Sequence, residues 1–283
     1  MKLVRFEAGD AVHIGAVKAD GIVDLTLAQS RFQTILSIVI AGDVALAFLA
    51  DVVTDTAPSH SLAEVRLCAP IERPGKYLAI GMNYRKHLEE SDKLGVARSA
   101  HQVWFNKQTT CISGPYEVIE PGVTEKLDYE VELGVVIGAA AKNVSEADAR
   151  SHVFGYFVAN DVSARDWQFH SPTFTMGKSF DTHGPIGPWI VTADEVANPH
   201  DLALRCFVNG EKRQDNNTSG MIADIWQQIA YLSTAFTLEP GDLIATGTPE
   251  GVGVAMDPQV FLQSGDVVRC EIDGIGSIEN RVA

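Results

Sequence analysis

The sequence DYEVELGVVIG occupies residues 128–138, and its first half alternates acidic with apolar side chains. Because successive side chains of a β-strand point to opposite faces, this alternation predicts a strand whose acidic residues share one face. The apolar run that follows, residues 135–137, favours a central strand, where carboxylates are costly unless positive charge compensates them. An acidic edge strand facing solvent is the alternative. The three acidic residues are Asp128, Glu130 and Glu132.

A further carboxylate, Asp161, follows the apolar run of residues 153–159. Functional side chains are often found where a buried strand ends and a loop begins. Side chains two apart on one strand face lie roughly 7 Å from each other, so Glu130 and Glu132 can reach a single ion. Three carboxylates favour a hard cation, Mg²⁺, Mn²⁺ or Ca²⁺, over Zn²⁺. We therefore expect Glu130, Glu132 and Asp161 to form a metal site with open positions for water or substrate.

Residues 72–283 have the pattern of a predominantly β domain with a few flanking helices. Short apolar runs are frequent, and Gly and Pro separate them. Apolar residues spaced three and four apart predict a helix within residues 222–236, and Ser145 followed by Asp148 predicts a capped helix start. The expected strands are residues 77–81, 129–137, 153–159, 189–192, 202–208, 243–246 and 267–272.

The first 71 residues predict a small α/β domain of their own. Strands are expected at residues 2–7, 11–18 and 21–25, because turn residues separate these alternating runs. Helices are expected at residues 26–41 and 44–53, and the polar stretch 55–61, which contains Pro58, suits a linker. The predicted fold class is therefore α+β, mainly β, with domains at residues 1–71 and 72–283.

Charge and hydropathy exclude several classes of protein. The formal net charge of −15 argues against nucleic-acid binding, which needs clustered Lys and Arg. No run approaches the roughly 20 apolar residues of a membrane span, and residues 1–7 alternate in polarity, unlike a signal peptide. A cytoplasmic protein without membrane contact is expected. The four cysteines are far apart in sequence, which predicts reduced core thiols rather than a zinc or redox motif.

Five segments, taken together, carry a family resemblance. They are GMNYRKHLEE (81–90), DYEVELGVVIG (128–138), GYFVANDVSARDWQ (155–168), MGKSFDTHGPIGPW (176–189) and GDLIATGTPEGVG (241–253). In this order they resemble the fumarylacetoacetate hydrolase family, from about residue 72 to the end. The resemblance implies a mixed β-roll, usually a homodimer, with Mg²⁺ or Mn²⁺ held by a Glu-x-Glu pair and a later Asp. Those positions are here Glu130, Glu132 and Asp161, the residues already selected on chemical grounds.

His87 and Glu90 lie three residues apart in a stretch that can be helical from about residue 85 to 94. On a helix this spacing places both side chains on one face, where a carboxylate orients an imidazole and raises its basicity. An isolated pair of this kind is most often a surface contact. The resemblance implies instead the water-activating dyad of acylpyruvase-type members, which is carried on a lid that orders with substrate. The charged stretch 86–98 is compatible with such a lid.

Four more residues acquire roles through the resemblance. A lone lysine is ordinarily a solvated surface charge, but Lys178 matches the active-site lysine that helps to stabilise an enolate. Arg165 could bind a substrate carboxylate, but the resemblance favours a residue that supports the metal-site carboxylates. Gln168 matches a substrate contact. Thr248 matches the substrate-binding threonine, in a Gly-rich loop whose hydroxyl and N–H groups can meet a substrate carboxylate. The loop lacks the Gly-Lys-Ser/Thr ending of a phosphate-binding P-loop.

These features predict a Mg²⁺- or Mn²⁺-dependent hydrolase that cleaves the C–C bond of a 2,4-diketo acid to give pyruvate and a carboxylic acid. The substrate would be an acylpyruvate, with a 2,4-diketo-3-deoxy sugar acid as one candidate. The dyad favours hydrolysis, because a general base matters most where water attacks. An oxaloacetate decarboxylase or a hydroxymuconate-type isomerase stays open, since both use the same enolate. A non-catalytic metal- or metabolite-binding protein also stays open, whereas a zinc hydrolase is disfavoured because HExxH is absent.

Overall fold

The protein, described by a computed structural model for residues 1–283 except 94, 96 and 97, is a strand-dominated α+β fold. Its main sheet runs in the order β4-β3-β2-β1-β13-β11-β10-β16-β6-β7, and the short strands β5 and β8 pair with β1 and β13. The predicted fold class is confirmed. The strands of this sheet are β1 (Lys2–Ala8), β2 (Ala11–Lys18), β3 (Gly21–Asp24), β4 (His60–Ser61), β5 (Leu67–Cys68), β6 (Tyr77–Gly81), β7 (Val103–Asn106), β8 (Ile112–Ser113), β10 (Val131–Ile137), β11 (Val153–Asn160), β13 (Gly184–Thr192) and β16 (Leu243–Ala245).

Strand β10 lies inside this sheet, between β11 and β16, so the alternative of an exposed edge strand is wrong. Its side chains alternate as expected, with Val131, Leu133 and Val135 in one core and Val136 in the core on the opposite face. The strand is buried along its whole length. It begins two residues later than predicted, because Asp128 belongs to a separate short strand, β9 (Leu127–Asp128), which pairs with β12 (Ser163–Ala164).

A second sheet covers one face of the first. It has the order β15-β14-β17-β18, formed by β14 (Ala203–Val208), β15 (Glu211–Asn217), β17 (Val267–Ile272) and β18 (Gly276–Arg281). Its inward side chains, among them Leu204, Cys206 and Cys270, share one hydrophobic core with the apolar side of β10. The acidic side chains of β10 therefore face away from the second sheet.

The N-terminal elements extend the main sheet, because β1 pairs antiparallel with β13. The expected helix at residues 26–41 is two helices, α1 (Leu25–Ala28) and α2 (Ile35–Ala41), followed by α3 (Asp43–Asp55). The break occurs because the Gln29 side chain bonds the backbone of Leu25 and Phe32, and Thr34 caps α2 in a capping box. Whether residues 1–71 fold independently stays a prediction.

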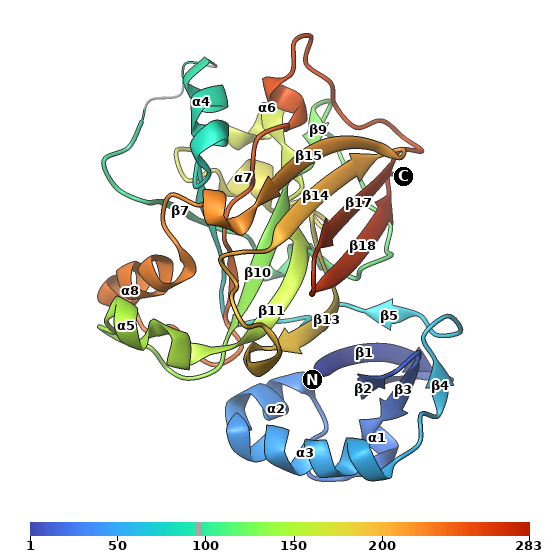
Figure 1. Cartoon of the computed structure of the whole chain (residues 1–283). Coiled ribbons are helices and arrows are strands. Elements are labelled where there is room, and N and C mark those ends of the chain that lie inside the picture. Colours follow the sequence, from blue (N-terminus) through green and yellow to red (C-terminus); the bar gives the residue numbers. More distant parts are fainter. Residues whose placement is uncertain (94, 96–97) are drawn as a thin grey trace.

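The remaining helices are short apart from α4 and α8. They are α4 (Arg85–Lys93), α5 (Glu146–Ala149), α6 (Arg165–Gln168), α7 (Thr175–Lys178) and α8 (Ile225–Ala235). Ser145 caps α5 as predicted, and the expected helix at 85–94 is α4, although Leu94 lies outside the described residues. Helices α4, α6 and α7 gather at one end of the molecule, and α1 to α3 lie at the other (Figure 1). No helix in the described part of the chain is long and apolar enough to cross a membrane. All four cysteines are free and buried, as expected.

Candidate functional site

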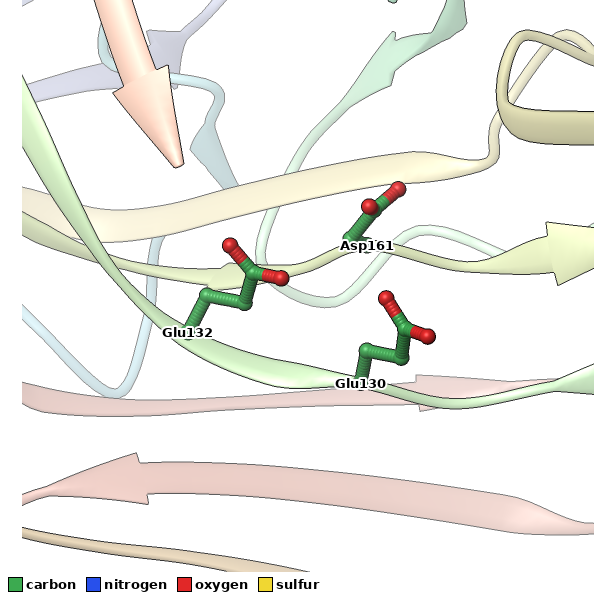
Figure 2. Close-up of side chains that lie close together, drawn as sticks. All are labelled: Glu130, Glu132 and Asp161. Atoms are coloured by element: carbon green, nitrogen blue, oxygen red, sulfur yellow. The ribbon is translucent and has the colours of Figure 1, made fainter. Parts of the chain in front are cut away.

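The predicted metal ligands meet where β10 begins and β11 ends. The antiparallel register pairs Val131 with Asn160, so Glu130 and Asp161 lie opposite each other one residue further on, and the Asp161 N–H donates to Glu130 O at 2.9 Å. Figure 2 shows the carboxylates of Glu130, Glu132 and Asp161 directed into one space. Each offers one oxygen, and these oxygens lie within 4.8 Å of one another. All three side chains are buried, so two separate strands converge on one site as predicted.

Two predicted cations pair with carboxylates of this cluster. The Lys178 Nζ donates to Glu130 Oε2 at 2.6 Å and to Asp161 Oδ2 at 2.9 Å. The Arg165 guanidinium donates to Glu130 Oε1 at 2.7 Å and to Asp128 Oδ2 at 2.8 Å. Gly177 allows α7 to pack this closely on α6, since a Cβ there would lie 2.3 Å from the Gln168 Cα. Arg165 thus occupies the supporting position that the resemblance implied.

A third cation, Lys107, was not among the predicted site residues. It lies just after β7, its side chain is fully buried, and its Nζ donates at 2.5 Å both to Asp161 Oδ1 and to the Lys178 carbonyl oxygen. Lysines are almost never fully buried without a charged partner. Lys107 therefore holds the oxygen of Asp161 that Lys178 does not contact.

The two glutamates differ in their charge partners. Burial alone would raise the pKa of Glu130, but Lys178 and Arg165 outweigh burial and hold that pKa well below its usual range. Burial, followed by the neighbouring Asp161 and Glu130, raises the pKa of Glu132 well above its usual range. The only hydrogen bond to the Glu132 side chain within the described residues comes from the Gly247 N–H, at 2.8 Å from Oε2.

The side chains of this cluster are chemically suited to a divalent cation. Three buried carboxylate oxygens are the donor set that hard cations prefer, and Glu132 pairs with no cationic side chain within the described residues. A buried carboxylate is stable as the anion only with such compensation. Glu130, Glu132 and Asp161 are therefore the residues that would hold the ion.

His87 and Glu90 form the expected pair on α4. The His87 Nδ1 lies 3.1 Å from Glu90 Oε2, and the Glu90 Oε1 accepts from the Gly251 N–H at 3.0 Å. With Nδ1 hydrogen-bonded to a carboxylate, the imidazole proton of neutral His87 lies on Nδ1 and Nε2 is free. The lid assignment for residues 86–98 includes residues 94, 96 and 97, which lie outside the described part, and stays a prediction.

Thr248 and Gln168 also lie at the site. The Thr248 hydroxyl donates to Val131 O at 3.0 Å and accepts from the Gln214 Nε2 at 2.9 Å, so its proton is used within the protein. Gln168 accepts from the Arg165 Nη1 at 3.1 Å through its carbonyl oxygen, which leaves its amide group for a ligand. Gln214 is a second residue that was not predicted. It lies on β15, is 1% exposed, and its Oε1 accepts from the Val131 N–H at the start of β10.

A cavity of about 620 Å³ opens over the carboxylates and brings the predicted residues together. Its inner part is charged, whereas Phe105, Phe174 and Phe169 form a row of edge-to-face aromatic contacts along it. Lys126 lines the cavity, and its ammonium has no carboxylate partner within the described residues. The predicted residues that line the cavity are His87, Glu130, Glu132, Arg165, Gln168, Lys178 and Thr248.

Comparison with known proteins finds relatives that match this chain over its full length. The mitochondrial oxaloacetate tautomerase FAHD2A of Homo sapiens is 40% identical over 290 residues, covering 100% of this chain and 91% of the relative. The crystal structure of maleylpyruvate hydrolase from Sphingobium sp. SYK-6, in complex with manganese(II) ion and pyruvate, is 32% identical with a TM-score of 0.82 and covers 100% of this chain and 99% of that one.

A third relative carries an isomerase name. The structure of 5-carboxymethyl-2-hydroxymuconate delta-isomerase from Mycobacterium smegmatis is 34% identical with a TM-score of 0.78 and covers 100% of this chain and 98% of that one. Relatives of this chain are thus enzymes named as hydrolase, isomerase and tautomerase. The family model described as fumarylacetoacetate (FAA) hydrolase C-terminal matches residues 76–283. On this match and these relatives, the chain belongs to the fumarylacetoacetate hydrolase family.

Proposed function

We propose that this protein is a Mg²⁺- or Mn²⁺-dependent hydrolase that cleaves the C3–C4 bond of a 2,4-diketo acid to give pyruvate and a carboxylic acid. One observation carries the proposal. His87, whose Nδ1 lies 3.1 Å from Glu90 Oε2, lines the same cavity as the buried carboxylates of Glu130 and Glu132. A base that can activate water therefore lies beside a site suited to a keto-acid head group.

A bound divalent cation would supply Lewis-acid polarisation of the keto-acid oxygens and would offset the surplus negative charge of the site. Support for such an ion comes from the carboxylate set of this chain and from the manganese named in the maleylpyruvate hydrolase structure. The choice between Mg²⁺ and Mn²⁺ does not follow from three carboxylates, since both ions accept oxygen ligands.

His87 would act as the general base through Nε2, because its Nδ1 is occupied by Glu90. It takes a proton from water as the water oxygen attacks the C4 carbonyl. The C3–C4 bond then breaks, and its electron pair remains on the three-carbon fragment as the enolate of pyruvate. Return of the proton to C3 completes pyruvate, and the acyl fragment leaves as a carboxylic acid.

Lys178 would stabilise the enolate as a fixed cation. Burial by itself lowers the pKa of Lys178, but the carboxylates of Asp161 and Glu130 outweigh it and raise that pKa, so the side chain remains an ammonium. An ammonium already held in place costs no reorganisation when negative charge develops. The Gln168 amide group and the backbone of Thr248 would orient the substrate carboxylate, because the Thr248 hydroxyl proton is directed at Val131 O.

The decisive experiment offers the purified protein an acylpyruvate and, separately, oxaloacetate, with Mg²⁺ and after exhaustive chelation. We expect pyruvate and a carboxylic acid from the acylpyruvate, and none after chelation. Release of CO₂ from oxaloacetate without acylpyruvate turnover would assign a decarboxylase instead. Turnover that survives chelation would contradict the metal-dependent scheme.

A tautomerase or isomerase is the second candidate, because the human relative is named an oxaloacetate tautomerase and the mycobacterial one an isomerase. Such a reaction needs only a proton to move, and His87 Nε2 could carry it between carbon and oxygen. The same assay separates the two. Fast decay of the enol absorbance of oxaloacetate, without CO₂ and without acylpyruvate cleavage, would favour the tautomerase.

A further inference from the structure

Glu90 contacts two different parts of the protein at once. Its Oε2 faces the His87 Nδ1 at 3.1 Å, and its Oε1 accepts from the Gly251 N–H at 3.0 Å. One carboxylate therefore links helix α4 to the loop of residues 247–254. Because both oxygens are engaged, the carboxylate cannot rotate without breaking one of the two contacts.

The same loop directs its backbone N–H groups at other carboxylates of the site. The Gly247 N–H donates to Glu132 Oε2 at 2.8 Å, and the Gly253 N–H donates to Asp128 Oδ1 at 2.8 Å. Asp128 in turn holds Arg165. One short segment thus contacts a candidate metal ligand, the partner of Arg165 and the partner of His87.

The orientation of the Gly251 N–H is set by its surroundings. Gly251 has φ = +99°, a value that glycine adopts readily, and a Cβ there would lie 2.1 Å from the Arg213 carbonyl oxygen. The preceding residue is anchored through its side chain, because Glu250 accepts from the Asn216 Nδ2 at 2.7 Å and pairs with Lys86 of α4 at 3.1 Å. The loop therefore presents a fixed donor to Glu90.

We propose that the backbone N–H of Gly251 is a positioning group for the His87–Glu90 pair: by holding one oxygen of Glu90, it keeps the other oxygen directed at His87 Nδ1. The proposal rests on the proposed role of His87 as the base. With Oε1 held by Gly251, Oε2 accepts the proton on His87 Nδ1, and Nε2 keeps its lone pair for the cavity. The orientation of the pair therefore depends on the contact of α4 with the loop that also holds Glu132.

Substitution of Glu90 by Gln tests this choice of orientation. A carboxamide has one accepting oxygen and one donating NH₂, so it cannot serve two donors. If Gly251 sets the orientation, the oxygen of Glu90→Gln stays on the Gly251 N–H, and its NH₂ donates to His87 Nδ1. The imidazole proton then moves to Nε2, and the base is lost although the packing is kept.

Two readouts need no substrate. Amide hydrogen exchange reports the Gly251 N–H, and ¹⁵N NMR of labelled histidine reports the tautomer of His87. In Glu90→Gln we expect a protected Gly251 and the reversed tautomer, with turnover reduced by roughly 10²–10⁴-fold, as for loss of a general base. In Glu90→Ala we expect Gly251 to exchange roughly 10- to 100-fold faster, as when a charge-assisted hydrogen bond is lost. The matched control is Glu89→Gln, on the exposed side of the same helix, which should match the wild type.

Two results would overturn the proposal. Gly251 exchange that is the same in Glu90→Ala and the wild type would mean that the contact does not form in solution. A wild-type tautomer together with an unprotected Gly251 in Glu90→Gln would mean that His87, and not Gly251, sets the orientation. If both NMR readouts follow expectation but no acylpyruvate is cleaved, the positioning role stands and the proposed hydrolase activity fails.

Discussion

Replacement of Lys107 by Met would test how far the buried cations stabilise the carboxylate site. Met is unbranched and apolar, so it fills much of the space of the lysine stem. The change removes two hydrogen bonds and leaves Asp161, which is fully buried, with Lys178 as its remaining cationic partner. Removal of one member of a buried ion pair lowers the free energy of unfolding by roughly 3–5 kcal/mol. Because the Lys178 contact with Asp161 survives, we expect a loss near the lower end of this range, about 3 kcal/mol.

The assay is thermal unfolding in a chelator and, separately, in excess Mg²⁺. A chain of 283 residues unfolds with an entropy of about 0.6 kcal/mol/K, so a loss of about 3 kcal/mol lowers Tm by about 5 °C in the chelator. With Mg²⁺ the loss should be less than half as large, because the ion compensates the charge of Asp161 that Lys107 had neutralised. Mg²⁺ should therefore raise the Tm of the variant by more than it raises that of the wild type.

Lys142→Met is the matched control, because Lys142 is exposed and contacts only the Thr234 carbonyl oxygen among the described residues. It should change stability by no more than about 0.5 kcal/mol. If Lys107→Met lowered the free energy of unfolding in the chelator by less than about 1 kcal/mol, the stabilisation attributed to the buried Lys107–Asp161 pair would be refuted. An equal loss with and without Mg²⁺ would refute the placement of the ion beside Asp161.

Three further predictions concern individual residues, and a fourth concerns the oligomeric state. His87→Ala should lower acylpyruvate hydrolysis by roughly 10²–10⁴-fold while leaving Mn²⁺ affinity, measured by titration calorimetry, nearly unchanged; an equal loss of Mn²⁺ binding would assign His87 to the metal site instead. Lys126→Met should raise KM about five-fold for acylpyruvates with a carboxylate on the acyl tail, since an exposed charge pair contributes about 1 kcal/mol. The KM for acylpyruvates with a neutral tail should not change. Equal effects on both kinds of substrate would exclude Lys126 from recognition of the tail. Burial lowers the pKa of His183 to about 4, so the unfolded chain takes up the proton first, and the free energy of unfolding falls as pH drops from about 6.5 to 4. His183→Gln should remove about 3 kcal/mol of that pH dependence, measured by denaturant titration at each pH. Identical pH profiles for variant and wild type would contradict this prediction. The expected homodimer should give a light-scattering mass of about twice 30.6 kDa, and a mass of 30.6 kDa would overturn it.

The cluster of three carboxylates was predictable from sequence because it depends on local periodicity and on the register of one strand pair. Alternation placed Glu130 and Glu132 on one face, and Asp161 ended the next long apolar run. Antiparallel pairing of β10 with β11 then brought Asp161 opposite Glu130. Helical spacing was likewise sufficient to pair His87 with Glu90.

Lys107 and Gln214 could not be found in this way, because their burial is produced by segments distant in sequence. Lys107 reaches Asp161 across 54 residues, and nothing in the run Val103–Asn106 marks the following lysine as buried. Gln214 lies in the polar strand β15, which lacks the apolar alternation that identifies strands, and it bonds the Val131 N–H 83 residues away. Only tertiary packing distinguishes these side chains from ordinary surface residues.

The formal charges of the site bear on the proposal that a chain with a net charge of −15 binds an anionic keto acid. Four buried carboxylates, those of Asp128, Glu130, Glu132 and Asp161, face three cations, Lys107, Arg165 and Lys178, which leaves one negative charge in excess. A bound divalent cation would change that excess to one positive charge, which would balance the single negative charge of a substrate carboxylate. Without the ion, the site would avoid repelling an anion only if Glu132 were protonated. The lysines and the arginine therefore compensate Asp128, Glu130 and Asp161, whereas in the proposed function a bound ion would compensate Glu132 and attract the substrate.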